Sequence, residues 1–414
     1  MKEYELIIVG GGSAGLAAAM GAYENGLNNI LIIEREPELG GILLQCIHNG
    51  FGLHMFKEEL SGPTYAERWI RNVQKTNINI KLDTAVLSIN SDLTIEYSNE
   101  EEGYSKIKGK SIVLAMGCRE RSRGAIAIPG YRPAGVLTAG TAQKYINILG
   151  NEIGKKVFIL GSGDIGLIMA RRMTLEGAEV MGVAEIMPYS NGLPRNVKQC
   201  LDDFNIPLYL SHTITFIDGH DRVKSITLSK VDDNLVPIKG TEKTFEVDTL
   251  LLSVGLIPEN DLSEMAGITL EKKTNGPIVN DNLQTSIPGI FACGNVLHVH
   301  DLVDYVSKEG LKAGKRAAEY VMNPKEDYDY ISINHDSNLS YILPNKIIKE
   351  HEGNVELMYR IKYPLKKATI ELRCGNEIVR EIKKTNLVPS IMEKILISKA
   401  LLKGNELTIG LKEE

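Results

Sequence analysis

Three glycines near the amino terminus have the spacing of a phosphate-binding turn. Gly10, Gly12 and Gly15 form a GxGxxG pattern directly after the apolar residues 6–9. The first glycine permits a tight turn, the second lets the backbone approach a pyrophosphate, and the third lets helix and strand pack closely. A helix that begins there directs its free N–H groups and the positive end of its dipole at the anion. The chemistry indicated is the binding of a dinucleotide.

The same pattern occurs a second time in the middle of the chain. Residues 155–185 repeat the order of residues 4–34: an apolar strand, a glycine turn, a helix, and a second strand that ends in a glutamate. The glycines of this second copy are Gly161, Gly163 and Gly166. A strand, a helix and a strand within ~30 residues form a βαβ unit, which builds a parallel sheet buried on both faces. Two such units predict hydride transfer between two bound dinucleotides.

Each repeat ends in a glutamate that can hold a ribose. Glu34 and Glu185 are placed to accept hydrogen bonds from the hydroxyls of an adenosine ribose. A carboxylate pairs with the free 2′-hydroxyl of NADH and repels the 2′-phosphate of NADPH, so Glu185 favours NADH. Binding of NADPH stays open, because one of three arginines could reach its 2′-phosphate: Arg171, Arg172 or Arg195. We expect Arg171 and Arg172 to be exposed helix residues.

Length and composition fit a globular protein of two or three domains. The 414 residues are 43% apolar and 24% charged. A net charge of -6 gives no general attraction to phosphate backbones, so we expect no nucleic-acid partner. Nothing approaches the ~20 apolar residues of a transmembrane helix, and the start of the chain is not a signal peptide. Five scattered cysteines indicate a reducing, cytoplasmic setting, and attachment to a membrane surface stays open.

The fold class that these patterns predict is α/β, with two Rossmann-like three-layer ββα domains and a small β-rich domain. We expect helices at 63–76 and 304–322, β-meanders over 78–113 and 206–254, and a short apolar helix at 388–402 after the β-like residues 355–385. The predicted domains are 1–120 and 255–325 as the two parts of the first dinucleotide-binding domain, 121–254 as the second, and 326–414 as the small carboxy-terminal domain.

Four further motifs make the chain resemble the two-dinucleotide-binding-domain flavoproteins, the pyridine nucleotide-disulfide oxidoreductase superfamily. They are GG at 40–41, LAMGCRER at 114–121, LLLSVGLIPEN at 250–260 and GIFACGN at 289–295. The resemblance covers residues 1 to about 322 and implies FAD on the first domain and NAD on the second. The last motif usually ends in Gly-Asp, whose acid binds the ribityl chain. Here Asn295 stands in its place and could still hydrogen-bond a hydroxyl.

The motifs and the resemblance together assign cofactor binding to a defined set of residues. They are Gly10, Gly12, Ser13, Ala14, Gly15, Glu34, Arg35, Gly40, Gly41, Ala115, Gly117, Gly161, Gly163, Asp164, Ile165, Gly166, Glu185, Gly255, Gly294, Asn295 and Asp304. For Asp304 the resemblance implies a helix whose start faces the flavin pyrimidine, and the alternative is a plain helix N-cap.

Two stretches resemble a narrower group of bacterial flavoproteins. GGILLQCIHNGFG at 40–52 and CGNVLHVHDLVD at 293–304 look like proteins associated with FAD-dependent glycerol-3-phosphate dehydrogenases. They are also similar to the FAD/NAD subunits of opine-type dehydrogenases and cyanide synthases. Such proteins share the fold of the disulfide reductases but work with partner subunits.

A redox-active disulfide is poorly supported. The GG region offers only Cys46, and residues 140–160 contain no cysteine. Cys46 beside His48 is a candidate for a lone reactive thiolate, and the alternative is a small buried residue that lines the FAD pocket. His48 and His298 are candidates for acid–base groups or for simple hydrogen bonding near the flavin. The HVH sequence points the rings of His298 and His300 to opposite faces of a strand, so we predict no metal site.

Three other groups of residues stay open to two interpretations. Arg119, Arg121 and Arg123 either steady cofactor phosphates or are solvated loop charges. We expect Cys118 and Cys293 to be packing residues. Residues 391–403, apolar on one face with three lysines, are expected to be a core-packed helix, with a membrane-surface or partner-binding helix as the alternative.

The function predicted is that of an FAD-dependent NADH oxidoreductase without a redox-active disulfide. It would pass hydride between NADH and a second substrate or a partner redox protein. The partner that the narrower resemblance implies is a glycerol-3-phosphate dehydrogenase-type flavoprotein, and a small-molecule acceptor is the alternative. Two other functions stay open: an NADH–quinone reductase at the membrane surface, and a non-catalytic subunit that senses FAD and NADH.

Overall fold

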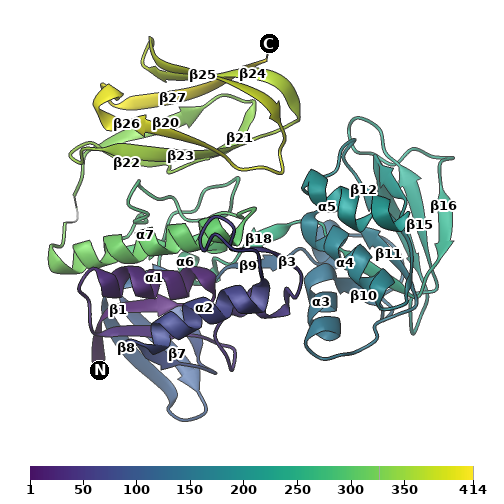
Figure 1. Ribbon diagram of the computed structural model, residues 1–414, viewed down its shortest axis with the longest axis horizontal. Helices are drawn as coiled ribbons and strands as arrows, with labels where there is room; N and C mark the ends of the chain where they lie inside the picture. The colour runs from purple at the N-terminus through teal and green to yellow at the C-terminus, as the bar shows by residue number, and fades with distance from the viewer. Residues whose placement is uncertain (326, 414) are drawn as a thin grey trace. The chain divides into compact units, whose positions relative to one another are not determined.

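The computed structural model describes residues 1–325 and 327–413 and shows two compact units (Figure 1). Unit 1 consists of Met1–Cys118 and Pro258–Glu414, and unit 2 consists of Arg119–Ile257. The first dinucleotide repeat therefore lies in unit 1 and the second in unit 2. Both units hold a Rossmann-like parallel sheet with helices, so the predicted α/β fold class is confirmed.

The central sheet of unit 1 has the strand order β5-β2-β1-β8-β7-β6, and β19 pairs with the end of β8. β5, β2, β1, β8 and β19 pair in parallel, whereas β7 and β6 are antiparallel. All four residues of β2 are buried, as expected for a strand covered on both faces. The bounds are β1 Lys2–Val9, β2 Ile30–Ile33, β5 Asn79–Lys81, β6 Ala85–Ile89, β7 Thr94–Asn99, β8 Gly103–Leu114 and β19 Ile290–Ala292.

The helices of unit 1 are α1 Ser13–Glu24, α2 Gly62–Gln74, α6 Asp261–Met265 and α7 Val303–Met322. The helices predicted at 63–76 and 304–322 are confirmed as α2 and α7. Small residues bring α1 and α7 close together, and Figure 1 shows them side by side. A Cβ on Gly314 would lie only 1.9 Å from the Ala18 carbonyl oxygen.

Unit 2 has a five-stranded parallel sheet of order β10-β17-β11-β12-β13 and a three-stranded antiparallel sheet of order β14-β15-β16. The parallel strands are β10 Val136–Thr138, β11 Lys156–Leu160, β12 Glu179–Glu185, β13 Leu208–Leu210 and β17 Thr249–Leu252. The antiparallel strands are β14 His212–Asp218, β15 Ser225–Lys230 and β16 Lys243–Glu246. The helices are α3 Ala139–Asn147, α4 Asp164–Leu175 and α5 Pro194–Cys200.

Four short strands lie in the connections. β3 Asn49–Phe51 pairs with β4 Leu60–Ser61, and β9 Cys118–Glu120 pairs with β18 Leu256–Pro258. The second pair lies where the chain passes from one unit to the other and back.

The tail of the chain forms two further sheets around a core of their own. One has the order β22-β20-β27-β24-β25 and the other β21-β23-β26. The bounds are β20 Tyr330–His335, β21 Leu339–Leu343, β22 Lys346–Ile348, β23 Asn354–Ile361, β24 Leu365–Cys374, β25 Glu377–Leu387, β26 Glu393–Ser398 and β27 Glu406–Glu413.

The helix predicted at 388–402 and 391–403 is wrong. This segment holds β26, which pairs with β23, and a 3₁₀ turn at Lys399–Leu401. Ile395 and Ile397 are buried, whereas the Leu396 side chain between them is 55% exposed. That alternation has the period of a strand, and β-branched residues favour the extended backbone.

The tail is fixed to the rest of unit 1 by apolar and ionic contacts. Leu343, Met358 and Met392 are buried in the same core as the central sheet. Arg360 pairs with Asp301, which also accepts a hydrogen bond from the Met392 backbone N–H. The face of the tail that carries these residues therefore packs against the rest of unit 1.

Candidate functional site

The first glycine turn has open space beside its middle glycine. Gly10 has φ +108°, and a Cβ there would lie 2.4 Å from the Ala115 carbonyl oxygen. A Cβ on Gly15 would lie 1.9 Å from the Gly10 carbonyl oxygen, whereas one on Gly12 would meet no described atom within 4 Å. The fold itself requires glycine at positions 10 and 15. The space at Gly12 fits a ligand that approaches the backbone, as a pyrophosphate does.

The start of α1 offers N–H groups to that space. Gly12 is the N-cap residue, and no described side chain caps the first turn that Ser13 and Ala14 begin. The first four N–H groups of a helix have no partner within the helix, and together with the dipole they attract an anion. These residues therefore fit the diphosphate of FAD.

Glu34 is held at the edge of the same turn. Its buried carboxylate accepts hydrogen bonds from the backbone N–H of Gly11 (2.6 Å) and of Glu36 (3.0 Å). An ionised carboxylate has about four acceptor sites, so two remain for ribose hydroxyls. Arg35 is exposed and lies 3.9 Å from Glu36, on the outer side of the strand end.

Two of the other FAD motifs contact this turn. The Gly40 N–H donates to the Gly11 carbonyl oxygen (2.9 Å), and Gly40 and Gly41 have φ of +115° and +58°. The Ala115 N–H donates to the Val9 carbonyl oxygen (2.9 Å). The structure thus brings the GG pair and the segment that begins at 114 to the glycine turn.

Gly117 and Gly255 lie near the passages between the units, each within its own unit. Gly117 has φ +75°, and its carbonyl oxygen accepts from the Glu259 N–H (3.0 Å). Gly255 has φ +101°, and its carbonyl oxygen accepts from the Arg121 N–H (3.0 Å). Both glycines serve backbone conformations that other residues rarely adopt. Their cofactor-binding role stays a prediction.

The second glycine turn repeats the geometry of the first. Gly161 has φ +100°, and a Cβ there would lie 2.0 Å from the Ser253 carbonyl oxygen. A Cβ on Gly166 would lie 2.6 Å from the Gly161 carbonyl oxygen, whereas the nearest atom to one on Gly163 is the Ser253 Oγ at 3.4 Å. The middle glycine again faces the roomiest position. Gly163 is the N-cap residue of α4, so the turn fits a second pyrophosphate.

Glu185 occupies the place in unit 2 that Glu34 occupies in unit 1. Its carboxylate is 3% exposed and accepts from the Ser162 N–H (3.0 Å), the Ser162 hydroxyl (2.7 Å) and the Met187 N–H (3.0 Å). The donor N–H and the glutamate are 23 residues apart in both repeats. Three hydrogen bonds hold the negative charge of Glu185 in place beside the turn.

Asp164 and Ser162 fasten the segment after β12 to the turn. The Asp164 carboxylate accepts from the Leu193 N–H (2.8 Å) and from the Asn196 amide (2.7 Å). The Ser162 hydroxyl accepts from the Asn191 N–H (3.0 Å). The structure therefore shows Asp164 as a residue that shapes the nucleotide site, and Ile165 follows it in the first turn of α4.

Two of the three arginines that leave the choice between NADH and NADPH open have contacts elsewhere. Arg172 pairs with Glu176 along α4, and Arg171 lies over the Phe204 ring, 5.9 Å from its centre. Arg195 is exposed at the start of α5. Arg171 is exposed on α4 as expected, whereas Arg172 is only partly exposed.

The second FAD motif forms a tight turn after β19. Gly294 has φ +74°, and its N–H donates to the Glu309 carboxylate (2.6 Å). The Asn295 side chain accepts from the His300 N–H (3.1 Å) and donates toward the Cys118 sulfur (3.5 Å). Asn295 thus has a fixed orientation within the protein.

The expectation that His298 and His300 point to opposite faces is wrong. The chain forms a 3₁₀ turn at Gly294–Val296 instead of a strand, and the two rings lie 4.1 Å apart. Both Nε2 atoms contact the Glu309 carboxylate, at 3.2 Å from His298 and 3.0 Å from His300. Among the described residues these three are a group that could hold a metal ion, with ligand atoms within 4.8 Å of one another.

Cys46 and His48 lie in the loop after the GG pair. The Cys46 thiol donates to the Ile42 carbonyl oxygen (3.4 Å), and burial raises the pKa of this thiol to about 12. The His48 ring contacts the Phe51 ring at 4.9 Å and the Asn49 carbonyl oxygen at 3.1 Å. A thiol with a raised pKa is a poor nucleophile, so this environment favours the packing role of Cys46.

None of the five cysteines, all of which lie in the described part of the chain, forms a disulfide. Cys293 is fully buried, and burial raises its pKa. Asp304 is also buried, in the first turn of α7, and it accepts from the Met55 N–H (3.0 Å). That contact ties the 52–56 loop to α7, which is a different role from a simple N-cap.

Arg123 is a loop residue rather than a phosphate ligand. Its guanidinium donates to the carbonyl oxygens of Ile128 (3.1 Å), Gly130 (3.1 Å) and Tyr131. These bonds close the 123–131 loop and occupy the donors that a phosphate would need.

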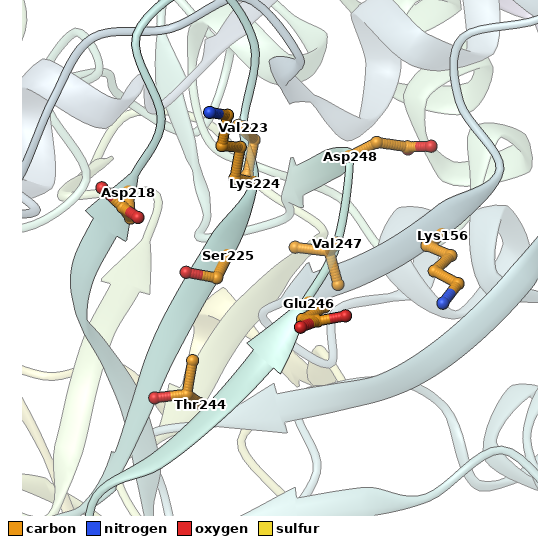
Figure 2. Close-up of a pocket in the computed structure, with 9 residues that line it drawn as sticks. All are labelled: Lys156, Asp218, Val223, Lys224, Ser225, Thr244, Glu246, Val247 and Asp248. Atoms are coloured by element: carbon orange, nitrogen blue, oxygen red, sulfur yellow. The ribbon is translucent and has the colours of Figure 1, made fainter.

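The hollow drawn in Figure 2 lies in unit 2, away from the glycine turn. It has a volume of about 500 Å³ and begins at Lys156, the first residue of β11, whereas the turn follows the last residue of that strand. Its lining is Lys156, Asp218, Val223, Lys224, Ser225, Thr244, Glu246, Val247 and Asp248. None of these is a predicted site residue, and the ligands of parallel α/β sheets bind at the other end of the strands.

Sequence reasoning missed two residues of these sites. Ser162 takes the place of Gly11 in the second repeat, and aligning the two repeats could have revealed it as the partner of Glu185. Glu309 lies on α7 and belongs to no sequence motif. Its role is therefore visible only from the packing of α7 against the turn at Gly294.

Comparisons with known proteins agree with this geometry. The family model described as "Pyridine nucleotide-disulphide oxidoreductase" matches residues 4–318. The thioredoxin reductase of Ureaplasma parvum is 25% identical over 333 residues, which cover 77% of this chain and 97% of that protein. The hydrogen cyanide synthase subunit HcnB of Pseudomonas protegens is 25% identical over 314 residues, which cover 70% of this chain and 65% of that subunit.

A solved structure gives the same result for the fold. The thioredoxin reductase of T. acidophilum superposes with a TM-score of 0.63 at 22% identity, over 78% of this chain and 100% of that chain. Within the described part of the chain, no helix has the length and apolar character needed to cross a membrane.

Proposed function

The chain belongs to the pyridine nucleotide-disulphide oxidoreductase family, and we propose that it transfers hydride between NADH and a second substrate or partner redox protein through FAD. Members of this family use FAD and NAD(P)H. The observation that carries the proposal is the repeated turn. Each copy leaves room at its middle glycine, Gly12 or Gly163, and anchors a glutamate beside it.

The chain's own residues would bind and orient the two cofactors. Bound FAD would supply a two-electron acceptor for hydride. The start of α1 at Gly12 would hold its diphosphate, and Glu34 would hold its adenosine ribose. The start of α4 at Gly163 and the carboxylate of Glu185 would hold the same groups of NADH.

Glu185 supports NADH over NADPH. Its charge is fixed by three hydrogen bonds and cannot swing aside to admit a 2′-phosphate. Arg171 contacts the Phe204 ring and Arg172 pairs with Glu176, so both have other partners. Arg195, exposed at the start of α5, stays open as a partner for that phosphate. A fixed carboxylate repels a second anion and accepts from a free 2′-hydroxyl.

The environment of Cys46 supports a mechanism without a redox disulfide. Burial raises the pKa of Cys46, which leaves it as the neutral thiol near pH 7. Electrons would therefore leave the flavin directly for the second substrate, without a protein dithiol as an intermediate store.

Anaerobic stopped-flow mixing of the FAD-loaded protein with NADH and, separately, with NADPH tests this proposal. We expect fast bleaching of the flavin absorption band by NADH and slow bleaching by NADPH. Absence of bleaching by either nucleotide would refute the oxidoreductase proposal and favour a non-catalytic sensing subunit. Equal rates of bleaching by NADH and NADPH would show that Glu185 does not select between the two nucleotides.

We further propose that the second substrate is a partner redox protein. One relative, HcnB, is a subunit of hydrogen cyanide synthase, and the chain matches 65% of that subunit's length. The sequence resemblance makes a glycerol-3-phosphate dehydrogenase-type flavoprotein the first partner to test. NADH-dependent reduction of such a purified flavoprotein, compared with free quinones and dyes, separates this proposal from a small-molecule acceptor.

The quinone reductase alternative has lost its structural support. It depended on an amphipathic helix at 391–403, and that segment is β26 with a short turn. Ile395 and Ile397, two of the apolar residues of this segment, are buried in the core of the tail.

A further inference from the structure

A buried cluster of Glu309, His298 and His300 lies against the turn that the second FAD motif forms. The two carboxylate oxygens of Glu309 contact the Nε2 of His298 (3.2 Å) and the Nε2 of His300 (3.0 Å). The same carboxylate accepts the Gly294 N–H at 2.6 Å. Glu309 is 6% exposed and His298 is 1% exposed. Three N–H groups therefore converge on one carboxylate that water does not reach.

The contacts favour an ionised Glu309 beside a neutral His298. Burial by itself raises the pKa of Glu309, but the interactions with His300 and His298 outweigh it and hold the pKa well below its usual range. Burial, together with His300, lowers the pKa of His298 to about 4. Glu309 thus carries a buried negative charge near pH 7.

Two cations, Arg360 and Lys312, also interact with this cluster. Arg360 is already paired with Asp301. Burial lowers the pKa of Lys312, which lies one turn further along α7. A buried charge such as that of Glu309 interacts strongly with its neighbours, because the local dielectric constant is low.

Hydrogen bonding explains the cluster better than a bound metal ion does. A histidine that ligates a metal almost always donates its other ring N–H to a partner. The His298 Nδ1 is buried and has no hydrogen-bond partner among the described residues. If the Nε2 atom bound a metal, this Nδ1 would carry an unsatisfied proton. If the Nε2–H donates to Glu309, Nδ1 carries only a lone pair.

The cluster holds both residues of the turn at once. Glu309 binds the Gly294 N–H, and His300 donates its backbone N–H to the Asn295 side chain (3.1 Å). The turn also packs on the first turn of α1, since a Cβ on Gly294 would lie 2.8 Å from the Ala14 Cβ. A shift of the Glu309 carboxylate would therefore move a turn that adjoins the first phosphate-binding site.

We propose that Glu309 is a positioning residue of the FAD site, which fixes the Gly294–Asn295 turn and places a buried negative charge behind it. The inference rests on the proposed function, because it assumes that this site takes up FAD. Without the charge, the side chain at position 309 would no longer be a matched acceptor for the N–H groups that converge on it. Loss of the charge would also make the bound flavin easier to reduce, since the reduced flavin carries more negative charge.

Two variants of Glu309 separate the charge from the reach of the side chain. Glu309→Gln keeps the size but presents an NH₂ group to at least one of three N–H donors. Glu309→Asp keeps the charge but withdraws it by one methylene. Glu319→Gln is the matched control, because Glu319 is a half-exposed residue of the same helix that pairs with Lys315 and Arg316.

The experiment reconstitutes each full-length protein with FAD and measures the dissociation constant and the midpoint potential of the bound flavin. For Glu309→Gln we expect a dissociation constant raised roughly 10- to 100-fold, as for a buried donor left unsatisfied, and a potential shifted to more positive values. For Glu309→Asp we expect weaker binding at the wild-type potential. For Glu319→Gln we expect neither change.

Three results would overturn the inference. Wild-type affinity and potential in Glu309→Gln would show that Glu309 does not act on the flavin site, and would leave the proposed function intact. Stoichiometric tight binding of Zn²⁺ to the wild-type protein, lost in both Glu309 variants, would show a metal site in place of a positioning residue. Absence of FAD binding by the wild-type protein would overturn the inference together with the proposed function.

Discussion

Replacement of Gly163 by alanine is expected to impair NADH binding while leaving the fold and the FAD site intact. Gly163 has φ -64° and ψ 160°, a conformation that alanine adopts without strain. A Cβ there would lie 3.4 Å from the Ser253 Oγ, an ordinary van der Waals contact. A glycine-to-alanine change at a compatible position stabilises a protein by about 0.4–1 kcal/mol through the unfolded chain. We therefore expect an unchanged or slightly higher melting temperature.

The effect on the nucleotide follows from where the methyl group lies. It would occupy space that a pyrophosphate needs to approach the N–H groups at the start of α4. A hydrogen bond to a charged group contributes about 1.5–3 kcal/mol. Because each 1.4 kcal/mol is a factor of ten, the loss of one such bond predicts a roughly 10- to 150-fold higher half-saturating concentration of NADH.

Stopped-flow reduction of the bound flavin over a range of NADH concentrations measures this effect, with FAD content as the internal check. Gly161→Ala is the control, because φ is +100° there and a Cβ would lie 2.0 Å from the Ser253 carbonyl oxygen. We expect that variant to lose soluble protein. A Gly163→Ala protein with the wild-type dependence on NADH would refute the assignment of this turn to the nucleotide.

Three further predictions concern single residues. Glu185→Ala is expected to weaken NADH binding about tenfold and to narrow the preference over NADPH, since a charge-assisted bond and a repulsive charge are both removed; unchanged kinetic constants for both nucleotides would contradict this. Cys46→Ser is expected to reduce with NADH at a rate within about twofold of wild type, because burial raises the pKa of the thiol to about 12; fast alkylation of Cys46 at pH 8 would argue otherwise. His298 has a folded-state pKa of about 4, below the value of 6.5 for a free histidine, so the unfolded chain takes up a proton that the folded chain does not. Its contribution to stability is complete above pH 6.5, and about 3 kcal/mol is lost as the pH falls to 4. Urea unfolding of the wild type and His298→Gln at pH 7 and pH 4.5 checks this, and an identical loss in both proteins would show that His298 is not its source.

The two nucleotide turns could be predicted from the sequence because their causes are local. Glycines at fixed spacing, an apolar strand before them and a glutamate at the end of the next strand all lie within ~30 residues. The structure adds the reason for each glycine. Gly10 and Gly161 avoid a backbone carbonyl, whereas Gly12 and Gly163 face open or nearly open space.

The tail could not be predicted to the same degree because its decisive contacts are distant in sequence. Residues 391–403 contain apolar residues that satisfy a helical period and a strand period over a short length. The segment forms a strand rather than a helix because β26 pairs with β23, and this pairing buries Ile395 and Ile397. The residues of this segment alone do not indicate that it pairs with β23.

The positions of His298 and His300 could not be predicted from the sequence for the same reason. Treating residues 298–300 as a strand separates the two rings, but the chain turns after Gly294 and brings both to Glu309. Glu309 comes from α7, and its role depends on how closely α7 packs on α1. Close packing through small residues, such as Gly314 on Ala18, is a property of two helices and not of either sequence alone.

Anaerobic titration of the FAD-loaded protein with NADH tests the central claim most directly, because it counts the electrons that the protein accepts. Hydride transfer to FAD without a redox-active disulfide predicts that the flavin band is bleached completely by one NADH per FAD, because FAD alone would accept the two electrons. Consumption of two NADH per FAD would show that a dithiol shares the electrons, and no bleaching would show that NADH does not reduce the flavin.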